Sequence, residues 1–274
     1  MKHYIPVLSI AGSDCSGGAG IQADLKTISA LGSYAATAIT AITVQNTCGV
    51  RAIHPVPAEI VKGQIAAVME DIHPEAIKIG MVNDTAVIRA IVESLKLYHP
   101  RHVVFDPVMV STSGHKLIED DAIRLITEEL MPLADVITPN LQEAEVLCGK
   151  QLSTVSDMQQ AAKELLKFGC KAVLLKGGHL GGNQMVDVLL MVGRTAPRLY
   201  SATKVESRNT HGTGCSLSSA IATLLAQGHS LPEAVDGAKT YVREGIRKGK
   251  DIEIGSGHGP LNHFFAPIPM KIKE

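Results

Sequence analysis

The chain has 274 residues, with 26 Lys and Arg against 27 Asp and Glu, which gives a formal net charge of −1. Hydrophobic residues make up 45% of it and aromatic residues 3%, a composition that excludes an intrinsically disordered chain and can fill the core of a large α/β domain. The neutral balance argues against nucleic acids and anionic membranes as partners, because both are bound through basic surfaces, and single-stranded nucleic acids also need aromatic rings to stack on.

Apolar segments typical of strands alternate with amphipathic segments typical of helices along the whole chain. The expected strands are residues 5–11, 36–44, 76–79, 102–105, 135–137, 172–175, 185–191 and 198–201. The expected helices are residues 19–31, 58–71, 85–98, 120–131, 142–147, 157–168, 214–226 and 231–247. This alternation predicts βαβ crossovers and an α/β fold whose central, mostly parallel sheet is flanked by helices on both faces. No linker or internal repeat divides the sequence, so we expect one domain over residues 1–274.

A glycine-rich loop at residues 11–20 joins the first expected strand to the first expected helix. Part of it, Gly18-Ala19-Gly20-Ile21-Gln22-Ala23, fits the G-x-G-x-x-G/A pattern of dinucleotide-binding folds. That fold also needs an acidic residue about 20 positions further on, to hold the ribose. No Asp or Glu occurs between Asp24 and Glu59, so the sequence disfavours a dehydrogenase. The loop still lets a ligand approach the backbone, with Asp14 and Asp24 as hydrogen-bond acceptors.

Polar side chains follow the fourth, fifth and sixth expected strands. Asp106 comes directly after the fourth strand, and Asn140 and Glu143 follow the fifth. Their oxygens suit Mg²⁺ or its waters, and Asn140 also has the position of a helix N-cap with Glu143 as its capping-box partner. Lys176, in Lys176-Gly177-Gly178-His179, follows the sixth strand. It fits either a point charge for a phosphate or an ordinary lysine in a hairpin turn.

The segment Asn-Thr-His-Gly-Thr-Gly-Cys-Ser at residues 209–216 precedes a helix of small residues. Gly212 and Gly214 allow a tight turn, and the unpaired N–H groups at the start of the helix form an anion site. Cys215 lies in the first turn, which predicts a lowered thiol pKa and a reactive thiolate, although an isolated cysteine is also a common structural residue. His211 fits an ordinary polar loop residue. Neither a Walker A motif nor a Gly-x-Ser-x-Gly elbow occurs.

The five cysteines are scattered along the chain and form no Cys-x-x-Cys pair; they are Cys15, Cys48, Cys148, Cys170 and Cys215. This pattern predicts neither a disulfide framework nor a zinc site, and it is typical of a reducing compartment. The first residues also lack the apolar run of a secretory signal. We therefore expect a cytoplasmic protein.

Seven motifs, in chain order, resemble one family. They are AGSDCSGGAGIQADLKT at residues 11–27, QNT at 45–47, DPVM at 106–109, TPNLQEAE at 138–145, KGGH at 176–179, THGTGC at 210–215 and GSGHGPLNH at 255–263. On these motifs the chain is similar to the hydroxymethylpyrimidine/phosphomethylpyrimidine kinase family of thiamine biosynthesis, within the ribokinase superfamily. The resemblance implies a single ribokinase-like domain without a P-loop, ATP and Mg²⁺ as cofactors, and a homodimer. It implies transfer of the γ-phosphoryl group of ATP to 4-amino-5-hydroxymethyl-2-methylpyrimidine and then to its monophosphate.

The resemblance also implies a role for individual residues. Cys215, where most ribokinase-like enzymes have an Asp, would activate the hydroxymethyl oxygen. The residues that would hold the transferring phosphoryl group are Gly212, Thr213 and Gly214. Those that would organise Mg²⁺ are Asp106 and, through water, Glu143. Those that would contact ATP are Lys176, Asn140, Glu143 and Thr210. Gln45 would recognise the pyrimidine, in a pocket completed by Gly12, Asp24, Met81 and Val108.

Two alternatives stay open at this point. One is a pyridoxal/pyridoxine kinase, because related vitamin B6 kinases share the Gly-Cys turn. The Gln-Asn-Thr and Gly-His-Gly-Pro-Leu-Asn-His segments favour the pyrimidine substrate over it. The other is a non-catalytic relative that keeps the fold, which the unaltered Cys215, Asp106, Glu143 and Lys176 argue against.

Overall fold

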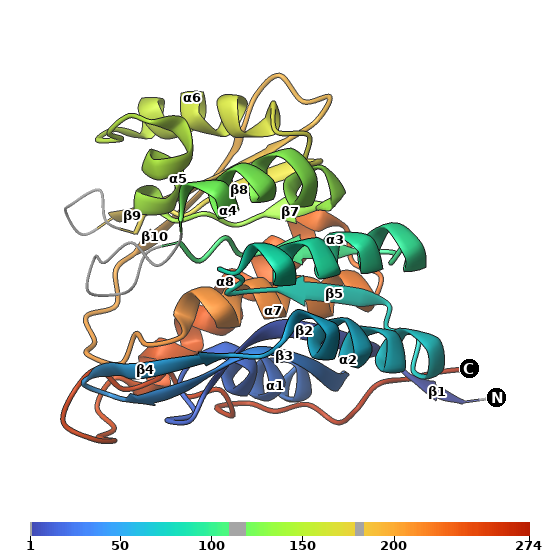
Figure 1. The fold of residues 1–274 in the computed structure, drawn as a ribbon. Coiled ribbons are helices and arrows are strands. Elements are labelled where there is room, and N and C mark those ends of the chain that lie inside the picture. Colours follow the sequence, from blue (N-terminus) through green and yellow to red (C-terminus); the bar gives the residue numbers. More distant parts are fainter. Residues whose placement is uncertain (1, 110–118, 179–183) are drawn as a thin grey trace.

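Figure 1 shows the fold in a computed structural model, which describes residues 2–109, 119–178 and 184–274. The strands are β1 (His3–Tyr4), β2 (Pro6–Asp14), β3 (Tyr34–Asn46), β4 (Gly49–Pro55), β5 (Ala76–Ile79), β6 (Val103–Phe105), β7 (Val136–Ile137), β8 (Ala172–Leu175), β9 (Gln184–Met191), β10 (Arg198–Thr203) and β11 (Ile272–Lys273). The helices are α1 (Gly20–Ala30), α2 (Ala58–Asp71), α3 (Thr85–Tyr98), α4 (Asp120–Leu125), α5 (Leu141–Cys148), α6 (Val155–Leu166), α7 (Thr213–Ala226) and α8 (Leu231–Gly249).

The described strands from β2 to β10 form one sheet in the order β10-β9-β8-β7-β6-β5-β2-β3-β4. The six strands from β8 to β3 in this order run parallel, whereas β10, β9 and β4 pair antiparallel with their neighbours. The chain passes from β2 to β3 on one side and later continues from β5 on the other side. This reversal of direction beside β2 is the place where open α/β sheets bind their ligands, outside the carboxyl ends of the strands.

Alternating strand residues fill two separate cores, one on each face of the sheet. Leu8 and Ile10 pack with α2, α3, α4, α5 and α6. Val7, on the opposite side of the same strand, packs with α1, α7 and α8. The continuously apolar strands of the sequence are therefore buried on both sides, as a parallel sheet covered by two layers of helices requires.

The elements expected from the sequence are present, and four of them, α2, α3, β5 and β8, have the expected bounds. The expected helix at residues 120–131 divides into α4, a π-helical turn at Ile126–Leu130 and a 3-10 turn at Met131–Leu133. Pro132 has no backbone N–H and cannot continue the α-helical pattern, which accounts for the change of winding near it.

The sequence prediction missed β4, which pairs with β3 across residues 46–49. Both faces of this edge strand are exposed, so it carries neither the alternation of a half-buried strand nor the apolar run of a buried one. Two short terminal strands were also missed. His3 lies opposite Lys273 in the β1–β11 pair, which brings the two ends of the described chain together, as Figure 1 shows.

None of the helices in the described ranges has the length and apolar character needed to cross a membrane.

Candidate active site

The carboxyl edge of the sheet gathers most of the side chains singled out in the sequence. Asp106 follows β6, Asn140 follows β7 and Lys176 follows β8. Parallel pairing of these strands places their carboxyl ends side by side. The first turn of α7 comes to the same edge, because a Cβ atom on Gly214 would lie 3.5 Å from Lys176 Nζ and 3.6 Å from Asp106 Oδ2.

Asp106 and Lys176 form an ion pair at the centre of this edge. Lys176 Nζ donates to Asp106 Oδ1 at 2.9 Å, and Thr138 Oγ1 donates to the same oxygen at 2.8 Å. Burial opposes the charge on Asp106, but the neighbouring Lys176 and Lys78 outweigh it and lower the pKa of the carboxyl. Burial likewise disfavours the charged lysine, but Asp106 outweighs that effect and raises the pKa of Lys176. Both groups are therefore charged, and Lys176 can reach a phosphate only by leaving or sharing this carboxylate.

Asn140 and Glu143 form the capping box that their spacing predicts. Asn140 Oδ1 accepts from the Glu143 N–H at 2.9 Å, and Glu143 Oε2 accepts from the Asn140 N–H at 2.7 Å. The box fixes the start of α5 and uses one oxygen of each side chain. Burial raises the pKa of Glu143 to about 7. The carboxyl group thus lies inside the edge, close to Asp106 and Lys176, rather than in solvent.

The amino ends of two helices, α1 and α7, lie close to Cys215. Gly212, at φ 76°, is the N-cap of α7, and a Cβ there would lie 1.9 Å from the carbonyl oxygen of Gly18. The turn is closed by Thr213, whose N–H and hydroxyl both donate to the Thr210 carbonyl, at 3.3 and 3.0 Å. The backbone N–H of Gly20, the first residue of α1, lies near enough to the Cys215 sulfur to favour its thiolate and lower its pKa. The amino ends of α1 and α7 therefore both face this side chain, and each favours negative charge there.

The prediction of a lowered thiol pKa at Cys215 is wrong. Burial raises the pKa of Cys215 to about 11, although Lys78 and the Gly20 N–H act in the opposite direction. The residue as a whole is partly exposed, but protein atoms surround its sulfur closely enough for loss of hydration to dominate. The sequence correctly predicted that Cys215 lies in the first turn of a helix, but this position did not predict the ionisation of its thiol.

The residues expected around the pyrimidine divide into two groups. A Cβ on Gly12 would lie 2.8 Å from Met81 Cε, which places these two residues in contact beside β2. Val108 lies close to the central ion pair, since its N–H donates to the Asp106 carbonyl at 2.8 Å. Asp24, by contrast, is fully buried, and its carboxylate binds Lys78 Nζ at 2.8 Å. Direct contact between Asp24 and a substrate does not fit this position, because protein groups already surround the carboxylate.

His211 was interpreted as an ordinary polar loop residue, but the structure places it beside Gln45. Its Nε2 lies 3.0 Å from Asp14 Oδ2 and 3.1 Å from Gln45 Nε2. Burial opposes ionisation of Asp14, but hydrogen bonds from His211 and Ser16 outweigh it and hold the pKa of that carboxyl well below its ordinary value. The His211 ring thus lies between the carboxylate of the first glycine-rich loop, to which its Nε2–H donates, and the side chain expected to read the pyrimidine. Gln45 belongs to the Gln-Asn-Thr motif and His211 to the Thr-His-Gly-Thr-Gly-Cys motif, and only the fold brings the two residues together.

Lys78 is a second residue that sequence reasoning missed. It interrupts the apolar run Ala-Ile-Lys-Ile of β5 and is completely buried. A charged residue in the middle of a buried strand is the one signal that could have identified it. His179, the last residue of the Lys-Gly-Gly-His motif, lies outside the described residues.

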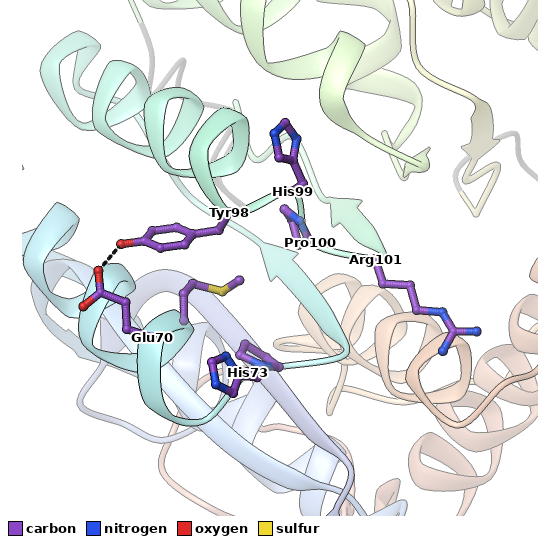
Figure 2. A pocket seen from close by; sticks show the side chains of 8 residues that line it. Glu70, His73, Tyr98, His99, Pro100 and Arg101 are labelled. Atoms are coloured by element: carbon purple, nitrogen blue, oxygen red, sulfur yellow. Dashed lines mark hydrogen bonds between the residues drawn. The ribbon is translucent and has the colours of Figure 1, made fainter.

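A separate hollow of about 480 Å³ lies at the opposite, amino edge of the sheet. Figure 2 shows its lining, which comes from the end of α2, the end of α3 and the loops that lead into β5 and β6. Tyr98 donates its hydroxyl to Glu70 at 2.6 Å there. None of the residues predicted for the site lines this hollow, so it takes no part in the arrangement at the carboxyl edge.

The family model and the sequence relatives name one kinase family, and solved structures of pyridoxal kinases share the fold. The family model described as phosphomethylpyrimidine kinase matches residues 14–262. A hydroxymethylpyrimidine/phosphomethylpyrimidine kinase of Rhizobium meliloti is 52% identical over 94% of this chain and 96% of its own length. The crystal structure of a phosphomethylpyrimidine kinase from Clostridium difficile has a TM-score of 0.79 at 48% identity, covering 88% of this chain and 99% of that one. A pyridoxal kinase from Staphylococcus aureus, solved with AMP-PCP and pyridoxal, has a TM-score of 0.86 at 31% identity and covers 98% of both chains.

Proposed function

The chain belongs to the phosphomethylpyrimidine kinase family, and we propose that its phosphoryl transfer takes place at the first turn of α7, with Cys215 as the proton acceptor. It catalyses the two phosphorylations of that family, on hydroxymethylpyrimidine and on its monophosphate. The observation that carries this proposal is the meeting of two helix amino ends at Cys215, next to the Asp106–Lys176 pair. Oriented N–H groups and a lysine are what a transferring phosphoryl group needs, since this reaction depends mainly on positioning and on charge stabilisation.

The proposed step is a single in-line transfer from ATP. The hydroxymethyl oxygen of the substrate bonds to the γ-phosphorus, and the bond from that phosphorus to the β,γ-bridging oxygen breaks, so that ADP leaves with the electron pair. The hydroxyl proton passes to the Cys215 thiolate, which becomes a thiol. Amides of Gly212 and Gly214 stabilise the charge on the transferring group, and that of Thr213 joins them by sharing its long bond to the Thr210 carbonyl. ATP as donor is supported by the AMP-PCP complex of the Staphylococcus aureus relative, because AMP-PCP is an analogue of ATP.

The residues at the edge fit a magnesium ion bound mainly through water. Within the described residues no group of three or more His, Cys, Asp or Glu side chains could hold a metal by itself. Asp106, Asn140 and Glu143 supply oxygen ligands only, and the capping box leaves one Glu143 oxygen outside it. Mg²⁺ suits such a set, because it keeps several waters and binds one or two carboxylates together with phosphate oxygens. When bound, it would neutralise phosphate charge next to Lys176.

We also propose that Gln45 reads the pyrimidine, with Gly12, Met81 and Val108 in the same pocket. The Gln45 amide offers a donor and an acceptor, which matches the edge of an aminopyrimidine. The position of its side chain beside His211, with 3.1 Å between the two Nε2 atoms, supports this role, because it brings the amide next to the turn before α7. The monophosphate would bind in the same orientation with its phosphate toward the start of α7.

A homodimer is the assembly we propose, formed through the edge strand β4 and the exposed side chains of its neighbour β3. Every residue of β4 is exposed, and apolar side chains on the two strands face outward; they are Ile42, Val44, Val50 and Ile53. An exposed edge strand is a template for pairing with another chain, and a second copy supplies the same edge. The cytoplasmic location expected from the cysteines stays a prediction.

Product analysis tests the proposed function. Hydroxymethylpyrimidine incubated with Mg·ATP should give first the monophosphate and then the diphosphate, and an equal concentration of pyridoxine should be phosphorylated far more slowly. Preferential phosphorylation of pyridoxine would contradict the substrate assignment. The Cys215→Ala variant should bind ATP normally and lose most of kcat, by about a hundredfold or more, as expected for removal of a positioned proton acceptor. Turnover of that variant at the normal rate would remove the catalytic role of the thiol.

A further inference from the structure

We propose that Lys78 is a positioning residue for phosphoryl transfer: its ammonium group, held by Asp24 beneath the first turns of α7, supplies the positive charge that stabilises Cys215 when its thiol loses the proton. This inference rests on the proposed role of Cys215. It assigns a function to a buried ion pair that has no role in the proposed function described above.

The position of Lys78 follows from the alternation of β5. Ile77 and Ile79 belong to the core formed with α2 and α3, so Lys78 faces the opposite side, where α1 and α7 pack. Its side chain is completely buried. A Cβ on Gly80 would lie 2.7 Å from Lys78 Nζ, which shows that the lysine extends along the strand toward the carboxyl edge. Lys78 therefore brings a charge from inside the sheet to the underside of the active site.

Asp24 holds the ammonium group under the helix that carries Cys215. Lys78 Nζ donates to both carboxylate oxygens of Asp24, at 3.0 and 2.8 Å. The same carboxylate accepts from Ser9 Oγ at 2.5 Å and from Ser219 Oγ at 2.7 Å. Ser219 is one helical turn beyond Cys215 and thus on the same face of α7. The ion pair and Ser219 form one hydrogen-bonded cluster between β5, α1 and α7, one helical turn from Cys215.

The ammonium group acts on Cys215 more strongly than the carboxylate that holds it. Burial raises the pKa of the Cys215 thiol, Lys78 opposes that rise, and Asp24 adds to it less than Lys78 subtracts. The other charged groups that face the thiol are Asp106 and Lys176, which are themselves paired. Of the two members of the pair, Lys78 thus has the larger effect on the thiol, and that effect favours the thiolate. A pair that served only to fill the core would not need this effect, since replacing such a pair by apolar residues is often neutral or stabilising.

Variants that remove the charges separately and together test this inference. Lys78→Met leaves Asp24 buried without a partner, so the informative protein is the double variant Lys78→Met/Asp24→Asn, in which neither charge remains. We expect it to fold, to keep KM for both substrates within about threefold and to lose kcat by about tenfold or more. The pH dependence of alkylation of Cys215 by iodoacetamide, followed on the Cys215 peptide by mass spectrometry, should shift to higher pH. Asp24→Asn alone should shift it to lower pH, because Lys78 is then unopposed.

A matched control removes a surface ion pair of similar length. Lys62 and Glu93 lie 2.6 Å apart with both side chains exposed, and Lys62→Met/Glu93→Gln should leave kcat and the alkylation profile unchanged. Lys78→Arg gives a second test that does not depend on the double variant. Since it keeps the positive charge, it should retain a kcat about tenfold or more above that of Lys78→Met.

The outcomes separate this inference from the proposed function. A double variant with normal kcat and an unshifted Cys215 profile would overturn the inference, and so would equal losses in Lys78→Arg and Lys78→Met. Normal turnover of Cys215→Ala would instead overturn the catalytic thiol itself, whatever the Lys78 variants do.

Discussion

Gly212 and Gly214 lie on either side of Thr213 at the start of α7, yet they meet different neighbours. Gly212 has φ 76°, and a Cβ on it would overlap the Gly18 carbonyl oxygen at 1.9 Å. A Cβ on Gly214 would make only ordinary contacts, with Lys176 Nζ at 3.5 Å and Asp106 Oδ2 at 3.6 Å. The first glycine is thus required by the fold, whereas the second keeps space open where we propose that the phosphoryl group is transferred.

Alanine substitutions should therefore separate stability from activity. Gly212→Ala should lose roughly 2 kcal/mol of unfolding free energy, because an L side chain is strained at positive φ and meets the Gly18 backbone. Gly214→Ala should unfold at nearly the normal temperature but lose kcat by about a hundredfold, since its methyl group fills space beside positioned donors. Thermal unfolding and steady-state kinetics measured on both variants check this. Equal destabilisation by the two substitutions, with parallel losses of activity, would contradict the assignment.

The thiol pKa of about 11 at Cys215 implies a definite dependence of rate on pH. Below that pKa the thiolate fraction of the free enzyme rises tenfold for each pH unit, and kcat/KM reports the free enzyme. We expect kcat/KM for hydroxymethylpyrimidine to rise about tenfold per unit between pH 7 and pH 9. Cys215→Asp should lack this rise, because a carboxylate is already ionised over that range. A flat profile in the unsubstituted enzyme would exclude the thiolate as the proton acceptor.

At the scale of elements, the carboxyl-terminal segment supports the start of α7. His263 is buried, and its Nε2 lies 2.9 Å from Ser216 Oγ, which also donates to the Gly212 carbonyl at 2.8 Å. With the hydroxyl proton used in that way, the histidine is the donor to Ser216. Tyr241 in α8 donates to the His263 carbonyl at 2.8 Å. The turn that carries Cys215 is therefore connected to both α8 and the last segment of the chain.

This buried histidine predicts a loss of stability in mild acid. Burial lowers the pKa of His263 from 6.5 to about 4, so the folded protein takes up a proton less readily than the unfolded chain. The neutral histidine therefore contributes about 3 kcal/mol to the free energy of unfolding. This contribution is fully present above pH 6.5 and decreases as the pH falls from 6.5 to 4. Urea unfolding at several pH values should show this decrease, and His263→Gln should show a smaller one. An identical dependence in the two proteins would mean that His263 does not control it.

The sequence predicted the elements that build the site because each polar residue directly follows an apolar strand. Asp106, Asn140 and Lys176 could be assigned to one edge from this pattern alone. The pairing of Lys78 with Asp24 could not, because the two residues are 54 positions apart and a lysine in a strand is usually exposed. The thiol pKa of Cys215 could not be predicted from the sequence either, since it depends on how closely β5, α1 and α7 pack around one sulfur.

At the scale of the whole molecule, the interior strands of the sheet differ from its edge strand β4 in how far they are covered. Its interior strands are covered by helices on both faces, whereas β4 is exposed along its length at the outer edge. The sequence predicted the covered strands through their apolar runs and missed β4, because an exposed edge has no such run. The edge that was hardest to predict is the one we assign to a second copy of the chain.

Charge at this edge should separate the two copies. Val50 and Ile53 are about half exposed, and Val50→Lys/Ile53→Lys should convert a dimer into a monomer in sedimentation experiments, because facing lysines repel and the apolar contact is lost. Leu97→Lys in α3 is a suitable control, since Leu97 is also exposed but lies on a different element. A protein that sediments as a monomer without any substitution, or a double variant that remains dimeric, would refute this assembly.

The pairing of β1 with β11 has a consequence for how this enzyme can be combined with others. Both ends of the described chain lie together, and β1 leads directly into the amino end of β2, whereas the site lies beyond the carboxyl ends of the strands. A second catalytic domain joined at either terminus would therefore extend from the edge opposite the substrate entrance. A domain fused at either terminus would thus leave the carboxyl edge open to the substrates of this enzyme.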